Sequence, residues 1–93
     1  MSRKTSVKVL VFGLVQGVFF RIFTQQQAEA LYLTGYVRNL SIGAVEAFAE
    51  GDKDKLKQFV SRLKTGPPDS KVDHIQITWG ECSRKFNNFK IRY

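Results

Sequence analysis

The chain of 93 residues has room for a single domain over 1–93, and a hydrophobic content of 43% is enough for a core. Fifteen Lys and Arg against eight Asp and Glu leave a net charge of +7, which attracts anions such as phosphate esters, nucleic acid or an acidic membrane surface. The single cysteine excludes a disulfide framework or a cysteine-based metal cage, the single histidine speaks against a His-rich metal site or a Ser–His–Asp triad, and no apolar run is long enough to span a bilayer.

The first residues carry the positive charge of a signal peptide without its other parts. Arg3 and Lys4 precede an apolar run, but Lys8 interrupts it and no small-residue cleavage site follows. We therefore expect no signal peptide and a cytoplasmic location, in which the single thiol stays reduced. Residues 1–5 are predicted to be disordered, as chain termini often are.

A strand, a loop and a helix are predicted in the first third of the chain. Val7, Val9 and Val11 recur at every second position, which is typical of a β-strand, and both faces are apolar enough for a central strand. Two glycines make Gly13–Gly17 a loop. Good helix formers follow and predict a helix from residue 20 or 21 to residue 33.

A second helix and four short strands are predicted in the rest of the chain. The helix has the cleanest amphipathic pattern of the sequence, with Asp52 as its cap and Gly66-Pro67-Pro68 as its end. The strands cover residues 36–40, 44–50, 74–79 and 89–93, and a tight turn at 41–43 joins the first two into a hairpin. This order, βαββαβ with a short C-terminal strand, indicates a ferredoxin-like α+β fold with two helices on one face of an antiparallel sheet.

The strongest local feature is the stretch between the first strand and the first helix, Gly13-Leu14-Val15-Gln16-Gly17-Val18-Phe19-Phe20-Arg21. Its glycines allow successive backbone N–H groups to turn inward, and the positive end of a helix lies behind them, so the loop can cradle a phosphate-sized anion. Arg21 is disfavoured by the dipole at a helix start, whereas a fixed guanidinium binds phosphate well. An ordinary loop with a solvated arginine explains the same residues.

Asn39 stands out in a second stretch, Gly35–Gly51, because Asn is uncommon in strands. Taken alone, its position before the turn favours a side chain that caps its own backbone. The alternative is that the amide holds a water or a substrate oxygen, since it donates and accepts hydrogen bonds at once.

Together the two stretches resemble the acylphosphatase family. Gly13–Arg21 has the form of the family's first signature, and Gly35-Tyr36-Val37-Arg38-Asn39 begins the second, which continues through Gly43, Val45 and Gly51 at the family's spacing. Gly66-Pro67-Pro68 and the ending Asn88–Tyr93 also look like family members. The resemblance therefore covers nearly the whole chain.

The resemblance implies an enzyme that hydrolyses the carboxyl–phosphate bond of acyl phosphates, with no metal or organic cofactor. Arg21 would bind the phosphoryl group, and Asn39 would orient the attacking water. Backbone amides would complete the phosphate site at Gln16, Gly17, Val18, Phe19 and Phe20. The substrate's own phosphoryl oxygen would accept the proton, because neither motif holds a suitable histidine or carboxylate. Leu40 stands where several members of the family have a hydroxyl residue. Phe19 occupies a position that varies between Phe and Gly in the family.

The alternative is a non-catalytic RNA- or anion-binding ferredoxin-like module. Phe12 and Phe48 could stack bases on the open sheet face, but Ala44–Phe48 lacks the characteristic RNA-binding run. Glu46 and Glu50 are expected on the same open face, too far apart for an acid–base pair. We expect a monomer whose partners are a small acyl phosphate and phosphate as product or inhibitor, with no membrane and no nucleic acid.

Overall fold

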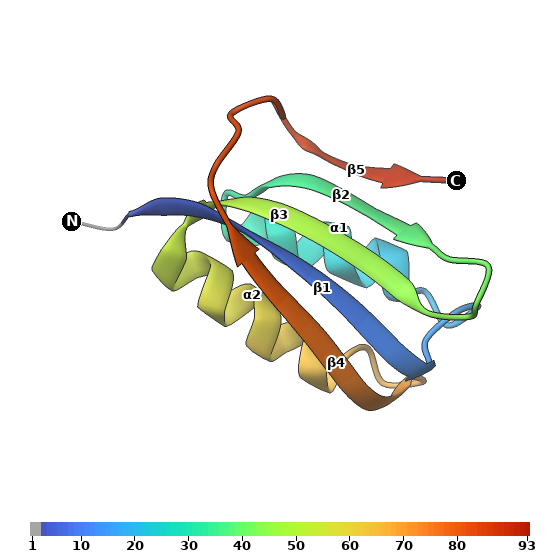
Figure 1. Cartoon of the computed structure of the whole chain (residues 1–93). Coiled ribbons are helices and arrows are strands. Elements are labelled where there is room, and N and C mark those ends of the chain that lie inside the picture. The colour runs from blue at the N-terminus through green and yellow to red at the C-terminus, as the bar shows by residue number, and fades with distance from the viewer. Residues whose placement is uncertain (1–2) are drawn as a thin grey trace.

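Five strands form one sheet, and both helices lie against one of its faces (Figure 1). The computed structural model describes residues 3–93. In chain order the elements are β1 (Lys4–Leu14), α1 (Phe20–Ala30), β2 (Thr34–Asn39), β3 (Val45–Asp52), α2 (Lys53–Thr65), β4 (Lys71–Gly80) and β5 (Phe89–Arg92). This order confirms the predicted ferredoxin-like α+β fold. No helix within residues 3–93 is long and apolar enough to cross a membrane.

The sheet is mixed rather than antiparallel throughout. Its strands lie in the order β4-β1-β3-β2-β5, and every neighbouring pair is antiparallel except β2 and β5, which are parallel. β4 ends beside Ser6, at the end of the sheet where β1 and β2 begin. Residues 81–88 cross that end to the free edge of β2, so β5 has to run in the direction of β2. The predicted antiparallel sheet is thus found in β1 to β4, and the short C-terminal strand, whose direction the sequence does not predict, adds a parallel pair.

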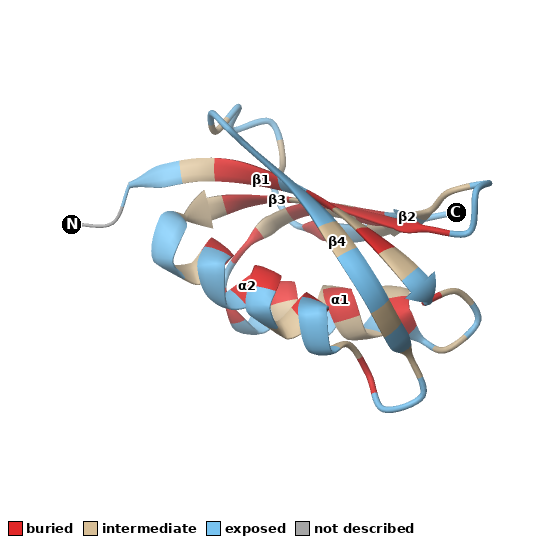
Figure 2. Ribbon diagram, turned by 60° about the horizontal axis from the view of Figure 1, so that its bottom comes forward, coloured by how far each residue is buried: buried red, intermediate tan, exposed pale blue. Residues whose placement is uncertain are grey.

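The core lies between the sheet and the helices (Figure 2). Val7, Val9 and Val11 of β1 are fully buried, as their alternation predicts. α2 contributes its predicted apolar stripe, Leu56, Phe59, Val60 and Leu63. Asp52 occupies the predicted N-cap position of α2, but its side chain makes no capping hydrogen bond. The elements that carry the site are thus anchored in one shared core.

Helix α1 ends at Ala30, before its predicted end at residue 33. Tyr32 has a left-handed backbone with φ 57°. Its N–H donates to the carbonyl of Glu29 at 3.1 Å, and the N–H of Leu33 donates to that of Ala28 at 2.9 Å, which is the pattern of a Schellman motif. Composition alone predicts a longer helix because a tyrosine gives no signal for this conformation, which glycine normally adopts.

The N-terminal strand begins earlier than predicted. Lys4 and Thr5, predicted to be disordered, pair with the end of β3, which extends beyond its predicted limit. The N–H of Lys53 donates to the carbonyl of Arg3 at 2.9 Å. The prediction of disorder is therefore wrong for residues 3–5, and residues 1–2 lie outside the described part of the chain.

The sheet face away from the helices is partly covered, and both of its glutamates are buried. Glu46 accepts hydrogen bonds from the Tyr36 hydroxyl at 3.0 Å and from Arg38 Nε at 2.6 Å. Glu50 accepts one from the backbone N–H of Ser83 at 2.6 Å, in the connection between β4 and β5. Burial raises the pKa of Glu46, but the two hydrogen bonds and the charge of Arg38 outweigh it and hold the pKa below its ordinary value. The predicted open position of the glutamates is wrong, because the β4–β5 connection contacts Glu50 and two side chains of β2 contact Glu46.

Candidate functional site

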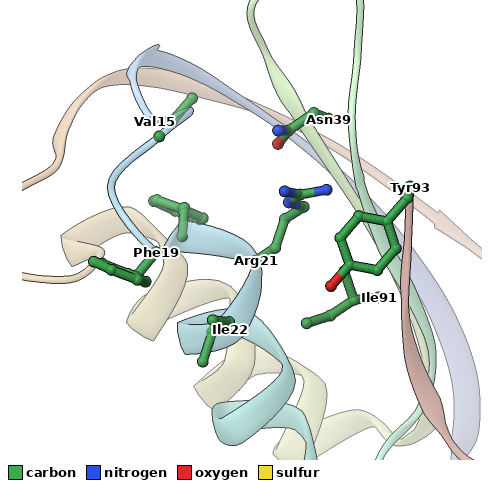
Figure 3. Close-up of a pocket in the computed structure, with 9 residues that line it drawn as sticks. Val15, Phe19, Arg21, Ile22, Asn39, Ile91 and Tyr93 are labelled. Carbon is green, nitrogen blue, oxygen red and sulfur yellow. The ribbon is translucent and has the colours of Figure 1, made fainter.

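A cleft of about 270 Å³ lies where β1, β2 and β5 end and α1 begins (Figure 3). It is lined by Val15, Gly17, Phe19, Phe20, Arg21, Ile22, Asn39, Ile91 and Tyr93. The fold therefore brings together the two side chains to which the sequence assigns the chemistry, Arg21 from α1 and Asn39 from β2.

The β1–α1 loop reaches the cleft with a left-handed backbone at two positions. Gly17 has φ 73°, and Phe19, the N-cap residue of α1, has φ 61° and makes no side-chain capping bond. None of the backbone N–H groups from Gln16 to Phe20 donates to another backbone group of residues 3–93. Unpaired N–H groups at the positive end of a helix are the elements of a phosphate cradle.

The side chain of Gln16 ties this loop to the β2–β3 hairpin. Its Nε2 donates to the carbonyl of Leu40 at 2.8 Å and to that of Ala44 at 2.9 Å. These two carbonyls flank the turn that follows Asn39, so one amide fixes the loop relative to the strand end that carries Asn39. The sequence predicts only a backbone role for Gln16, because the residues that its side chain contacts are distant along the chain.

Arg21 lies in the first turn of α1 and is free of ion pairs within the described residues. No acidic residue occupies that turn. The Arg21 Cζ lies 4.7 Å from the centre of the Tyr93 ring, a cation–π distance (Figure 3). A ring face positions the guanidinium without accepting an in-plane N–H bond, so its N–H groups remain available for an anion.

Asn39 ends β2 with its side chain toward the cleft (Figure 3). Its Oδ1 is the one buried side-chain N or O atom without a hydrogen-bond partner in the described chain. The turn that follows closes through backbone bonds instead, from the N–H of Leu40 to Ala44 and from that of Gly43 to Leu40. The interpretation of Asn39 as a turn-capping residue is therefore wrong, and its side-chain Oδ1 has no hydrogen-bond partner in the described chain.

The predicted site residues divide into those that line the cleft and those that support it. Gly17, Phe19 and Phe20 line it, whereas the Gln16 side chain bonds to the hairpin and Val18 packs against the core. Within residues 3–93, no three His, Cys, Asp or Glu side chains gather as a metal site requires.

Four lining residues are absent from the predicted site residues, namely Val15, Ile22, Ile91 and Tyr93. Alternation along the C-terminal strand places Ile91 and Tyr93 on one face, and this was the available signal. That signal does not reveal that β5 runs beside β2 and so ends at the start of α1.

Comparison with known proteins finds similar sequences along almost the whole chain. The family model described as Acylphosphatase matches residues 7–91. An acylphosphatase of Dehalococcoides mccartyi is 44% identical over 94% of this chain and 97% of its own length, and one of Pelotomaculum thermopropionicum is 41% identical over the whole of both chains. The crystal structure of acylphosphatase from Bacillus subtilis superimposes with a TM-score of 0.92 at 39% identity, over 96% of this chain and 99% of that one.

Proposed function

We propose a mechanism for this chain, which belongs to the acylphosphatase family and is an acylphosphatase. Arg21 and the backbone N–H groups of Gln16–Phe20 bind the phosphoryl group of an acyl phosphate. Asn39 orients the water that attacks phosphorus. A carboxylate and inorganic phosphate are released, and phosphate also inhibits because it binds the same donors.

The phosphoryl site is supported by groups that are fixed before the substrate arrives. The loop offers unpaired N–H groups, and the planar guanidinium of Arg21 has no carboxylate neighbour to neutralise it. Phosphoryl transfer asks the protein mainly for positioning and for stabilisation of the equatorial oxygens. Donors that need no reorganisation supply both.

The observation that carries the proposal is the unpartnered Oδ1 of Asn39. A buried acceptor without a partner costs about 1–3 kcal/mol, and a bound water that donates to it removes this cost. The same amide donates through its Nδ2, so it can hold a water in one orientation. Because the Gln16 side chain ties the phosphate loop to the hairpin of Asn39, that water is held relative to the phosphoryl group.

The proton balance needs no protein base. Among the residues that line the cleft, Arg21 alone has a charged side chain, and no Asp, Glu or His belongs to the lining. The water oxygen forms a bond to phosphorus while the bond between phosphorus and the acyl oxygen breaks. The electron pair of the breaking bond leaves with the carboxylate. The water proton passes to a phosphoryl oxygen of the substrate.

The non-catalytic alternative requires free aromatic rings on the sheet face away from the helices. Phe12 instead stacks on His74, with ring centres 4.5 Å apart, and Phe48 packs against Tyr36 and Phe86. These rings already have partners within the protein. We therefore favour the enzyme, and we propose that it acts as a monomer.

Hydrolysis of benzoyl phosphate with EDTA present, by wild type and by Arg21→Gln, tests the phosphoryl site. We expect rapid turnover by wild type and a loss of about 10³-fold in kcat/KM, with weaker inhibition by phosphate, in Arg21→Gln. Arg21→Lys should also be severe, since a point charge does not reproduce the planar fork.

Arg84→Gln is the matched control, because it removes the same charge from an exposed residue at the opposite end of the sheet. It should behave as wild type. No turnover by wild type, or near-normal turnover by Arg21→Gln, contradicts the proposal.

A further inference from the structure

Four residues with large apolar surfaces border the cleft around Arg21, and we call them the apolar rim: Phe19, Ile22, Ile91 and Tyr93. Phe19 is 74% exposed, Ile22 46% and Tyr93 99%. Ile91 and Tyr93 lie on the β5 side of Arg21, and Phe19 lies on the opposite side (Figure 3). Large apolar side chains left exposed together beside a cleft mark a surface that binds a ligand.

The side chains of the rim carry no charge with which to recognise a charged acyl group. Arg21 has the one charged side chain in the lining, and the proposed function commits it to the phosphoryl group. No second Lys, Arg or His of the described residues lines the cleft to pair with an anionic acyl group, and no Asp or Glu side chain lines it to pair with a cationic one. The part of the substrate beyond the phosphoryl group therefore meets apolar surface.

The size of the cleft limits that part of the substrate. A closed apolar cavity of roughly 150 Å³ holds a benzene molecule. The cleft has about 270 Å³ and is open to solvent at the rim. It has room for a phosphoryl group together with an acyl group of about one ring.

We propose that the apolar rim is the acyl-group subsite and selects acyl phosphates whose acyl group is neutral and apolar over those whose acyl group carries a further negative charge. This inference rests on the proposed function. An apolar acyl group gains by leaving water against the rim. A carboxylate placed there loses hydration and finds no partner. In closed hydrophobic pockets of enzymes one extra or missing methylene changes kcat/KM by roughly 10–200-fold, and the open rim is expected to discriminate less.

Ile22 is the residue with which to test the subsite, because it lies on the exposed side of α1 and lysine and alanine are both good helix formers. The measurement is kcat/KM for benzoyl, acetyl and succinyl phosphate, expressed as ratios to acetyl phosphate. The intrinsic reactivity of each compound cancels when a ratio is compared between variants.

Ile22→Lys should lower the benzoyl-to-acetyl ratio and raise the succinyl-to-acetyl ratio, each by about fivefold, because it exchanges apolar surface for a cation. Ile22→Ala should lower the first ratio by about threefold and leave the second unchanged. Gln26→Lys is the matched control, because it adds the same charge to an exposed position one turn further along α1. Its ratios should equal those of wild type.

The outcomes separate the two proposals. If all three compounds are hydrolysed and the ratios of Ile22→Lys and Ile22→Ala match wild type, the subsite is wrong and the proposed function stands. An Ile22→Lys variant whose succinyl-to-acetyl ratio does not rise above that of wild type also overturns the subsite. If wild type hydrolyses none of the three, the proposed function is wrong and the subsite with it.

Discussion

The two ends of helix α1 share a rare backbone feature and differ in everything around it. Phe19 before the helix and Tyr32 after it both have left-handed conformations, with φ 61° and 57°. At the C-terminal end, the N–H groups of Tyr32 and Leu33 satisfy two helix carbonyls, and Leu33 is buried. At the N-terminal end, the loop N–H groups from Gln16 to Phe20 stay unpaired within the described chain.

The difference between these ends distinguishes a stop signal from a binding site. A left-handed residue costs about 1–2 kcal/mol wherever it occurs, so the strain is the same at both ends. Around Tyr32 the strain closes a helix, and nothing polar is left over. Around Phe19 it accompanies an Arg21 without an ion pair and an Asn39 oxygen without a partner. Unsatisfied groups that converge on one cleft, rather than strained backbone, identify the site.

Gln16→Met should have the largest effect at the N-terminal end of α1. It removes the two side-chain hydrogen bonds between the β1–α1 loop and the β2–β3 hairpin while keeping the size of the side chain. The Leu40 and Ala44 carbonyls keep backbone donors, so the free energy of unfolding should fall by only about 1 kcal/mol. Turnover should fall more, by about tenfold in kcat, because the loop and Asn39 lose their fixed relation. Steady-state kinetics and urea unfolding measure the two effects.

Gln26→Met controls for the new side chain at an exposed position of α1 and should match wild type in both measurements. A Gln16→Met enzyme with unchanged kcat contradicts the positioning role of the amide. A loss of stability large enough to explain the whole loss of activity contradicts it as well.

Tyr32→Gly tests the C-terminal end of α1. It should stabilise the protein slightly, whereas Gln16→Met destabilises it. Glycine adopts the left-handed conformation freely, and the Tyr32 side chain is 88% exposed, so no packing is lost. The free energy of unfolding should rise by about 0.5–1 kcal/mol, measured by urea unfolding, with kcat/KM unchanged. A large loss of activity contradicts the division of roles between the two ends.

The fold follows from the sequence wherever local pattern and burial agree. Alternating Val7, Val9 and Val11 predict a buried central strand, and the stripe of α2 predicts its packing. The parallel pairing of β5 and the buried position of Glu50 depend on the path of residues 81–88, to which periodicity gives no guide. The sequence does not predict the end of α1, because the left-handed position after the helix is occupied by Tyr32 and not by the glycine that usually marks it.

The candidate site likewise has one part that the sequence predicts and one part that only the structure shows. The signatures around Arg21 and Asn39 mark residues whose types suit phosphate and water, and the structure places both in one cleft. The amide bonds of Gln16, the ring of Tyr93 over Arg21 and the apolar rim are contacts between distant parts of the chain. They depend on the β4-β1-β3-β2-β5 order, which places the ends of β1, β2 and β5 together. No spacing in the sequence reveals such contacts.

Asn39→Ala tests the central claim most directly, because it separates water positioning from phosphate binding. The measurement is kcat for benzoyl phosphate together with the inhibition constant of inorganic phosphate, for Asn39→Ala beside wild type and Arg21→Gln. We expect kcat to fall by about 10²–10³-fold with the phosphate constant nearly unchanged, whereas Arg21→Gln impairs both. An Asn39→Ala enzyme that keeps most of its kcat, or that loses phosphate binding as Arg21→Gln does, contradicts the claim.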